Sequence, residues 1–196
     1  MKIALLILAA GRSTRMKTAK QLLPVGTTTL LGSTIENALQ SNTQAIYCVL
    51  GAYAETVEAS ISKYKVEIIF NPNYKSGLSS SIAAGIEYLN HKQFDATLII
   101  LGDQPYVNAR YLNQMMATFK NNPDKIIATN YKTNLGVPAL IPKVYYTDLL
   151  NLEGDSGAKT FLNSKTNNII QLNNANVLDI DTKKEYQEYI DSVKFE

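Results

Sequence analysis

The residues best suited to chemistry follow the first apolar segment of the chain. Small residues at 9–11 are followed by Arg12, Arg15 and Lys20. A small, glycine-containing turn lets backbone N–H groups come close to a ligand. Arginine and lysine then supply positive charge for phosphate oxygens. This order of apolar strand, tight turn and cations predicts a site for a nucleoside triphosphate.

Two plainer interpretations of this segment compete with a nucleotide site. Met1 and Lys2 before eight apolar residues are typical of a signal peptide. The apolar stretch is short for that role, strongly basic residues follow it, and the aspartates further along fit export poorly. The other interpretation is the first strand of any α/β domain with solvated arginines, because short motifs also occur by chance.

A second group of candidate residues is acidic. Asp103 follows the apolar run 98–101, where a carboxylate must be paired, hydrogen-bonded or metal-bound because burying an isolated charge is costly. Asp179 and Asp181 would point to the same side of a strand. Separated carboxylates beside phosphates are a usual arrangement for Mg²⁺. The plainer alternative is that Asp103 caps the following turn and that one of the later pair caps a helix.

Three consecutive serines and a glycine-rich segment are weaker candidates. Ser79, Ser80 and Ser81 precede a helical pattern that starts near Ile82. Capping of free N–H groups explains one or two of these hydroxyls, whereas a run of three also suits hydrogen bonds to a base or ribose. Segment 154–159 has the composition of a turn that leads into a helix, and a surface turn with an Asp cap is its plainer interpretation.

Alternating strands and helices are expected to bring these residues together. Apolar runs predict strands at 2–9, 45–51, 66–70, 97–102, 126–131, 137–141 and 168–171. Helical spacing lies between the earlier runs, and residues 182–185 form a capping box before a last helix. The alternation predicts parallel strands with right-handed crossovers. We expect one domain over residues 1–196, a three-layer α/β/α sandwich with a Rossmann-like, mostly parallel sheet.

The predicted sheet places the candidate residues at one edge. Ligands of open parallel sheets bind beyond the carboxyl ends of the strands. Segments 10–15, 71–81 and 102–105 follow the first, third and fourth of the expected strands. All three segments therefore open onto the same rim.

Composition excludes several other classes of protein. The 196 residues suit one domain, and a net charge of +2 gives no general argument for binding nucleic acid or a membrane. No apolar run approaches the length that crosses a bilayer. Cys48, the single cysteine, lies in an apolar run where a buried, inert thiol is expected, which fits the reducing cytoplasm. With His91 as the single histidine, a zinc site or a Cys–His couple is nearly excluded.

Six segments together resemble the MobA-like nucleotidyltransferases and, within them, the molybdenum cofactor cytidylyltransferase branch. The matching segments are 8–16 with 20–24, 77–81, 101–105, 138–140, 154–159 and 179–182. They stand in the family's order and span nearly the whole chain. The resemblance implies a fold of the nucleotide-diphospho-sugar transferase type.

The resemblance also implies roles for individual residues. Nucleotide contacts fall on Leu8, Ala9, Ala10, Gly11, Arg12, Arg15, Lys20, Gly77, Ser79, Ser80 and Asp103. Acceptor contacts fall on Gln104, Pro138, Asp155, Gly157 and Lys159. Arg15, Lys20 and Asp103 would be catalytic, and Asp103 with Asp181 would bind Mg²⁺.

The reaction implied by the resemblance is transfer of CMP from CTP to a phosphate of a molybdopterin-type cofactor, with release of pyrophosphate. A molybdoenzyme or its maturation chaperone would be the protein partner. Ala10 resembles the cytidylyl-type loop, since guanylyl-type relatives carry glycine there, and its methyl group would restrict the space for a purine. Lys17 departs from the usual glycine, which adds a cation and removes conformational freedom. It would bring another phosphate contact or signal a different substrate.

Several alternatives remain open from the sequence. A related transferase would use GTP or another nucleoside triphosphate and another phosphorylated acceptor. The methylerythritol cytidylyltransferases share the first motif but lack the 102–105 and 154–159 segments. A non-catalytic nucleotide- or cofactor-binding module would keep the turn and lose the carboxylates. A dehydrogenase is disfavoured because residues 10–13 lack the G-x-G-x-x-G spacing.

Overall fold

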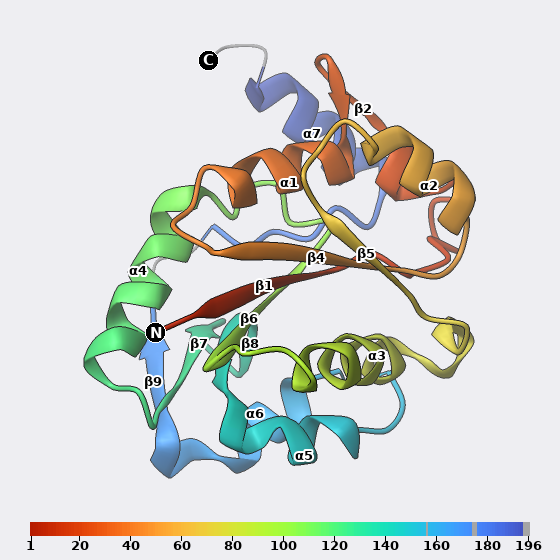
Figure 1. The fold of residues 1–196 in the computed structure, drawn as a ribbon. Helices are drawn as coiled ribbons and strands as arrows, with labels where there is room; N and C mark the ends of the chain where they lie inside the picture. The colour runs from red at the N-terminus through yellow and green to blue at the C-terminus, as the bar shows by residue number, and fades with distance from the viewer. Residues whose placement is uncertain (156, 174–175, 194–196) are drawn as a thin grey trace.

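The centre of the computed structural model is a seven-stranded sheet with helices on both faces (Figure 1). The structure describes residues 1–155, 157–173 and 176–193. The strand order is β5-β4-β1-β6-β8-β7-β9. The strands are β1 (Ile3–Leu8), β4 (Ala45–Leu50), β5 (Glu67–Phe70), β6 (Ala96–Leu101), β7 (Ile126–Asn130), β8 (Leu135–Pro142) and β9 (Ile169–Leu172). The expected three-layer α/β/α fold is confirmed.

Two layers of helices enclose this sheet. One layer contains α1 (Leu30–Leu39), α2 (Ala54–Ile61) and α4 (Ala109–Asn121), and the other contains α3 (Leu78–Asn90), α5 (Tyr146–Leu150) and α6 (Lys159–Ser164). The last helix, α7 (Lys183–Val193), lies beside α1 in Figure 1. A small hairpin joins β2 (Pro24–Val25) to β3 (Thr28–Thr29). Short 3₁₀ turns are η1 (Lys20–Leu22), η2 (Tyr74–Ser76), η3 (Lys143–Tyr145) and η4 (Thr166–Asn168).

Strand β1 explains why its sequence is apolar without interruption. All six of its residues are buried. Ile3, Leu5 and Ile7 pack in the core on the side of α1, α2 and α4. The alternate residues Ala4, Leu6 and Leu8 pack in the core on the side of α3, α5 and α6. A strand covered on both faces carries apolar residues at every position, which is typical of the centre of an α/β sheet.

Strand direction departs from the expectation at one place. β8 pairs antiparallel with both β6 and β7, whereas all other pairs in the sheet are parallel. Only residues 131–134 connect β7 to β8. A parallel crossover needs a dozen or more residues, so this connection forces a hairpin. The sheet is therefore mostly parallel, as expected, with one reversed strand.

The two expected helix starts had different outcomes. Helix α3 begins at Leu78 with Gly77 as its N-cap, so the three serines lie in its first turn instead of preceding it. The capping box before α7 is confirmed. Thr182 Oγ1 accepts from the Glu185 N–H at 3.2 Å, and Glu185 Oε2 accepts from the Thr182 N–H at 2.7 Å. Across the described residues, no helix combines the length and apolar character needed to cross a membrane.

Candidate functional site

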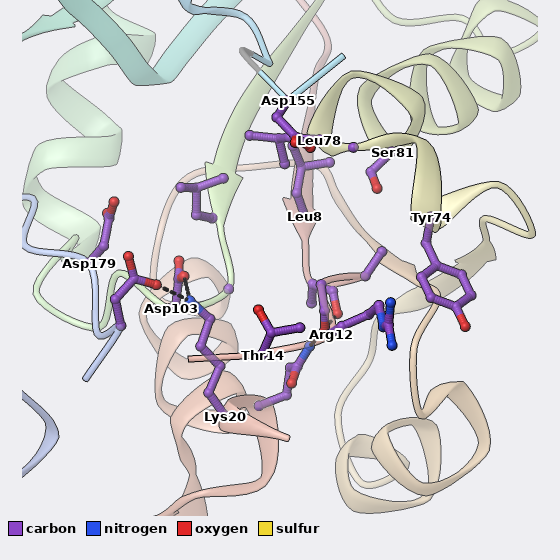
Figure 2. Close-up of a pocket in the computed structure, with 18 of the residues that line it drawn as sticks. Leu8, Arg12, Thr14, Lys20, Tyr74, Leu78, Ser81, Asp103, Asp155 and Asp179 are labelled. Carbon is purple, nitrogen blue, oxygen red and sulfur yellow. Dashed lines mark hydrogen bonds and ion pairs between the residues drawn. The ribbon is translucent and has the colours of Figure 1, made fainter. Parts of the chain in front are cut away.

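A cavity of about 500 Å³ opens at the carboxyl ends of β1 and β6 (Figure 2). The chain leaves β1 towards β4 on one side and returns with β6 on the other, so the cavity lies where the strand order reverses. This is the usual ligand position in open α/β sheets. Its lining includes eleven of the residues expected from the sequence: Leu8, Ala9, Ala10, Gly11, Arg12, Arg15, Lys20, Gly77, Asp103, Asp155 and Asp181.

The loop after β1 is held in place by Gln21, a residue that the sequence interpretation did not assign to the site. Its side chain is 4% exposed. Gln21 Nε2 donates to the carbonyl of Ala9 at 2.9 Å and to that of Gly11 at 2.8 Å. These bonds fix the curvature of the glycine loop. The available signal was a polar residue directly after Lys20 in an otherwise apolar segment.

Lys20 brings together carboxylates from two distant parts of the chain. Its Nζ donates to Asp181 Oδ1 at 2.7 Å and also contacts Asp103 Oδ2. Arg15 Nη1 lies 2.9 Å from the other oxygen of Asp181. Lys20 and Asp103 side chains are each 16% exposed, so this pairing is partly shielded from water. Two of the expected cations, Arg15 and Lys20, therefore form one cluster with Asp103 and Asp181.

The cluster favours the charged forms of Lys20 and Asp181. Burial lowers the pKa of Lys20, but Asp103 and Asp181 outweigh that effect and leave it above the usual 10.5. Burial acts to raise the pKa of Asp181, but the hydrogen bond and charge of Lys20, with Arg15, hold it below 3.8. Lys20 is thus an ammonium and Asp181 a carboxylate at neutral pH.

Asp179 joins this cluster from the other side. It lines the main cavity, and its Oδ1 accepts from Gln104 Nε2 at 2.7 Å. Burial, reinforced by the negative charge of Asp103, raises the pKa of Asp179 to about 6. The sequence placed Asp179 and Asp181 together only on the assumption of a strand. The structure has neither residue in a strand, yet both line the cavity.

The expected metal ligands, Asp103 and Asp181, have the chemistry that a divalent cation needs, although the Lys20 ammonium contacts both of them in this structure. Asp103 Oδ1 is buried, and no described residue gives it a hydrogen bond. Carboxylate oxygens are the ligands that Mg²⁺ and Mn²⁺ prefer. The described residues contain no group of three His, Cys, Asp or Glu side chains arranged to hold a metal. A divalent ion held by Asp103 and Asp181 would need further ligands, which substrate phosphates and water can supply.

The serine run does not face the cavity as a unit. Ser81 lines the cavity, whereas Ser79 is buried away from it and donates its backbone N–H to the Gly154 carbonyl at 3.2 Å. Ser80 Oγ donates to the Asn73 carbonyl at 2.9 Å, which ties the helix start to the preceding loop. Ser80 thus supports the loop after β5 in this structure.

The expected acceptor residues divide among three positions. Asp155 lines the main cavity, while Gln104 and Lys159 line a neighbouring cavity of about 170 Å³. Pro138 and Gly157 line neither of these cavities. The Pro138 carbonyl accepts from Thr129 Oγ1 at 2.7 Å, and a Cβ at Gly157 would meet the side chain of Leu78. Ser156 of the same segment lies outside the described residues.

Lys17 stands apart from the cluster. Its φ is 56°, a left-handed conformation that favours glycine. The loop thus keeps the backbone conformation expected of the family's usual glycine. The side chain is exposed and is absent from the lining of the main cavity. Lysine at position 17 therefore restricts the backbone of the loop, and in this structure it adds no cation to the lining of the main cavity.

Comparison with known proteins gives one family across most of the chain. The model of the MobA-like NTP transferase domain matches residues 5–169. The bifunctional protein GlmU of Pseudomonas putida is 31% identical over 119 residues, which cover 60% of this chain. The chain spans only about a quarter of the length of that relative. Nicotine blue oxidoreductase of Paenarthrobacter nicotinovorans is 29% identical over 169 residues, covering 81% of this chain and 80% of that protein.

Solved structures agree with this result over nearly the full length. An Rv0371c homologue from Mycobacterium sp. strain JC1 superposes with a TM-score of 0.87 at 29% identity. It covers 99% of this chain and 98% of its own. Rv0371c of Mycobacterium tuberculosis in complex with manganese has a TM-score of 0.80 at 26% identity and covers 98% of this chain and 100% of its own.

Proposed function

This chain belongs to the MobA-like NTP transferase family, and on that premise we propose that it is a cytidylyltransferase. It moves CMP from CTP to a phosphate of a molybdopterin-type acceptor and releases pyrophosphate. The reaction requires a divalent cation, Mg²⁺ or Mn²⁺. The manganese complex of the Rv0371c structure supports a divalent ion in this fold.

The observation that carries the proposal is the contact of Lys20 with both Asp103 and Asp181 at the carboxyl ends of the sheet. A non-catalytic binding module would be expected to keep the glycine turn and the cations and to lose the carboxylates, because negative charges repel the phosphates of a nucleotide. A transferase needs carboxylates there, because it must bind a positively charged metal ion beside the negatively charged triphosphate. The cluster therefore favours catalysis over simple binding.

Arg15 and Lys20 are proposed to bind the triphosphate. Both lie at the charged side of the main cavity, and Lys20 remains an ammonium at neutral pH. The backbone of residues 9–11 lines the same cavity, so it contacts the ribose or base side of the nucleotide. Ala10 narrows this wall by one methyl group relative to glycine, which favours a pyrimidine.

The chemical step is a direct displacement at phosphorus. A terminal phosphate oxygen of the acceptor forms a bond to the α-phosphorus of CTP, and the bond from that phosphorus to the bridging oxygen of the β-phosphate breaks. The electron pair leaves with pyrophosphate. Arg15 and Lys20 hold the phosphates in line and offset their charge. A divalent ion held by Asp103 and Asp181 would supply further charge neutralisation when bound.

The neighbouring cavity is proposed to receive the acceptor. It shares Leu8, Leu78, Leu101 and Asp179 with the main cavity, so the two sites adjoin. Gln104 Oε1 is buried there, and among the described residues it has no hydrogen-bond partner. An acceptor that donates a hydrogen bond at this point would satisfy it, since an unpaired buried carbonyl is costly.

A redox function is the second candidate. It is favoured by nicotine blue oxidoreductase, which aligns with this chain over most of both lengths. The clustered Asp103 and Asp181 have no evident use in hydride transfer. The two functions therefore predict different ligands: a nucleoside triphosphate with a divalent ion, or a nicotinamide cofactor.

One binding and activity panel tests these alternatives. Thermal unfolding is measured with CTP, GTP, UTP, ATP and NADPH, each with and without Mg²⁺, because a ligand of the native state raises the unfolding temperature. Pyrophosphate release is then measured with CTP and molybdopterin. We expect a Mg²⁺-dependent rise with CTP and release only when the acceptor is present. A response to NADPH alone would overturn the transferase proposal, and a response to GTP alone would overturn the choice of base.

A further inference from the structure

The main cavity has Lys20 and its carboxylates on one side and Tyr74, with Arg12 beside it, on the other (Figure 2). Figure 2 shows Lys20, Asp103 and Asp179 gathered on one side and Tyr74 on the other. Among the described residues that line this cavity, Tyr74 is the single aromatic one. A nucleotide has the same polarity, with charged phosphates at one end and a flat, uncharged base at the other. The ring of Tyr74 thus lies where a base would point if Lys20 held the phosphates.

Gly51 allows the tyrosine to approach the glycine loop. A Cβ at Gly51 would lie 2.5 Å from the Cβ of Tyr74, 2.8 Å from its Cγ and 3.0 Å from the Cβ of Ala10. No side chain fits in that space. The absence of one lets Tyr74 and Ala10 form a continuous wall of the cavity. Glycine at position 51 is therefore needed for close approach and not for a turn.

The loop that carries Tyr74 is held by a buried asparagine. Asn71 is 1% exposed, and its Nδ2 donates to Ser80 Oγ at 3.0 Å and to Ser81 Oγ at 3.1 Å. Its Oδ1 accepts from the Asn73 N–H at 2.9 Å. Ser80 Oγ also donates to the Asn73 carbonyl. These bonds hold the backbone of the residue before Tyr74, and Tyr74 itself packs against the core on the side of α3.

We propose that Tyr74 is the platform on which the nucleobase stacks, and that Asn71 and Ser80 are positioning residues for it. This inference rests on the proposed nucleotide transfer and assigns the base end of its site. A pre-positioned aromatic face loses little freedom on binding, and base–aromatic stacking contributes substantially to affinity. Stacking is tolerant of base identity. Tyr74 therefore provides affinity for any base, and neighbouring residues such as Ala10 would select one base over another.

The test compares a nucleotide with a ligand that has no base. Calorimetry measures the binding of CTP and of inorganic tripolyphosphate, each with Mg²⁺, to the full chain. The variants are Tyr74→Leu, which keeps apolar bulk without a ring, Tyr74→Phe, which keeps the ring, and Gly51→Ala, which displaces it. Phe70→Ala is the matched control, because Phe70 is an aromatic residue of the preceding strand, 59% exposed and outside the cavity.

We expect Tyr74→Leu and Gly51→Ala to weaken CTP binding about tenfold and to leave tripolyphosphate binding unchanged. Tyr74→Phe and Phe70→Ala should bind both ligands as the unsubstituted protein does. Equal CTP affinity in Tyr74→Leu would overturn the inference. So would an equal loss for CTP and tripolyphosphate, since that pattern reports damage to the whole cavity. If the unsubstituted protein binds neither ligand, the proposed function itself fails.

Discussion

The ammonium of Lys20 lies 2.7 Å from Oδ1 of Asp181, although 161 positions separate the two residues in the chain. The same ammonium contacts Asp103, so one cation joins carboxylates that follow β6 and precede α7. These are the carboxylates proposed to hold the metal. A cation already bound between two carboxylates competes with any other cation for them. We therefore expect Lys20 to limit metal binding in the nucleotide-free protein.

Removing this ammonium should tighten metal binding. We expect Lys20→Met to bind Mn²⁺ about tenfold more tightly without nucleotide, because a charge-assisted hydrogen bond contributes about 1.5–3 kcal/mol. Titration of free Mn²⁺ by electron paramagnetic resonance measures this directly. Lys17→Met is the control, since it removes an exposed cation of the same loop outside the cavity lining. Equal Mn²⁺ affinity in Lys20→Met and the unsubstituted protein would contradict the competition.

Neutralising Asp103 should abolish transfer while keeping the fold. Asp103→Asn retains an oxygen that accepts from Lys20 but removes the charge that a metal needs. We expect pyrophosphate release to fall by about a hundredfold or more, comparable with loss of one preorganised electrostatic contact in other enzymes. Circular dichroism and the unfolding temperature check the fold. Full activity in this variant would remove Asp103 from the metal site.

We expect Gln21 to affect activity by holding the glycine loop in place and not by contacting the substrate. Gln21→Met has similar volume but cannot donate to the carbonyls of Ala9 and Gly11. Leaving buried carbonyls unpaired costs about 1–3 kcal/mol, which chemical denaturation measures. We expect KM for CTP to rise more than kcat falls, since the loop lies on the nucleotide. Gln187→Met on the exposed face of α7 is the control, and an equal effect there would show a general loss of stability.

An element could be predicted from the sequence where one local rule decides its structure. The apolar run of β1 and the capping box at Thr182 were predictable because burial on both faces and reciprocal N–H contacts each leave a local pattern. The reversal of β8 was also available, since too few residues separate it from β7 for a crossover. The pattern of the serine run misplaced the helix start, because a helix can begin on Gly77 without a side-chain cap.

The parts of the site that could not be predicted from the sequence depend on long-range packing. Gln21 and Tyr74 have no distinctive spacing, and their roles arise from contacts with Ala9, Gly11 and Gly51. Such contacts form only after the strands are ordered in the sheet. Asp103 and the 179–181 pair were grouped as possible Mg²⁺ ligands from residue type, and the family resemblance then selected Asp103 and Asp181.

Cys48 should be unreactive in the native protein. It is fully buried in β4, and burial raises the pKa of its thiol to about 12. The thiolate is the reactive form, so little of it exists in the folded state at pH 8. We expect a disulfide reagent to label Cys48 only when denaturant unfolds the chain, with labelling that follows loss of circular dichroism. Rapid labelling of the native protein would show that the strand opens locally.

Glu185 should link the stability of α7 to Asp181, the proposed metal ligand. Its Oε2 accepts from the Asp181 N–H at 2.9 Å as well as from that of Thr182, so the capping box also fixes the backbone of Asp181. These backbone and side-chain hydrogen bonds lower the pKa of Glu185. Its stabilisation is therefore present above the unfolded pKa, near 4.5, and is lost as pH falls through the lower folded value.

Glu185→Ala should cost about 1 kcal/mol of unfolding free energy near pH 7 and weaken Mn²⁺ binding in the presence of CTP. Glu188→Ala, which removes an exposed carboxylate of the same helix, should leave Mn²⁺ binding unchanged. If the two variants weaken Mn²⁺ binding equally, the capping box does not position Asp181.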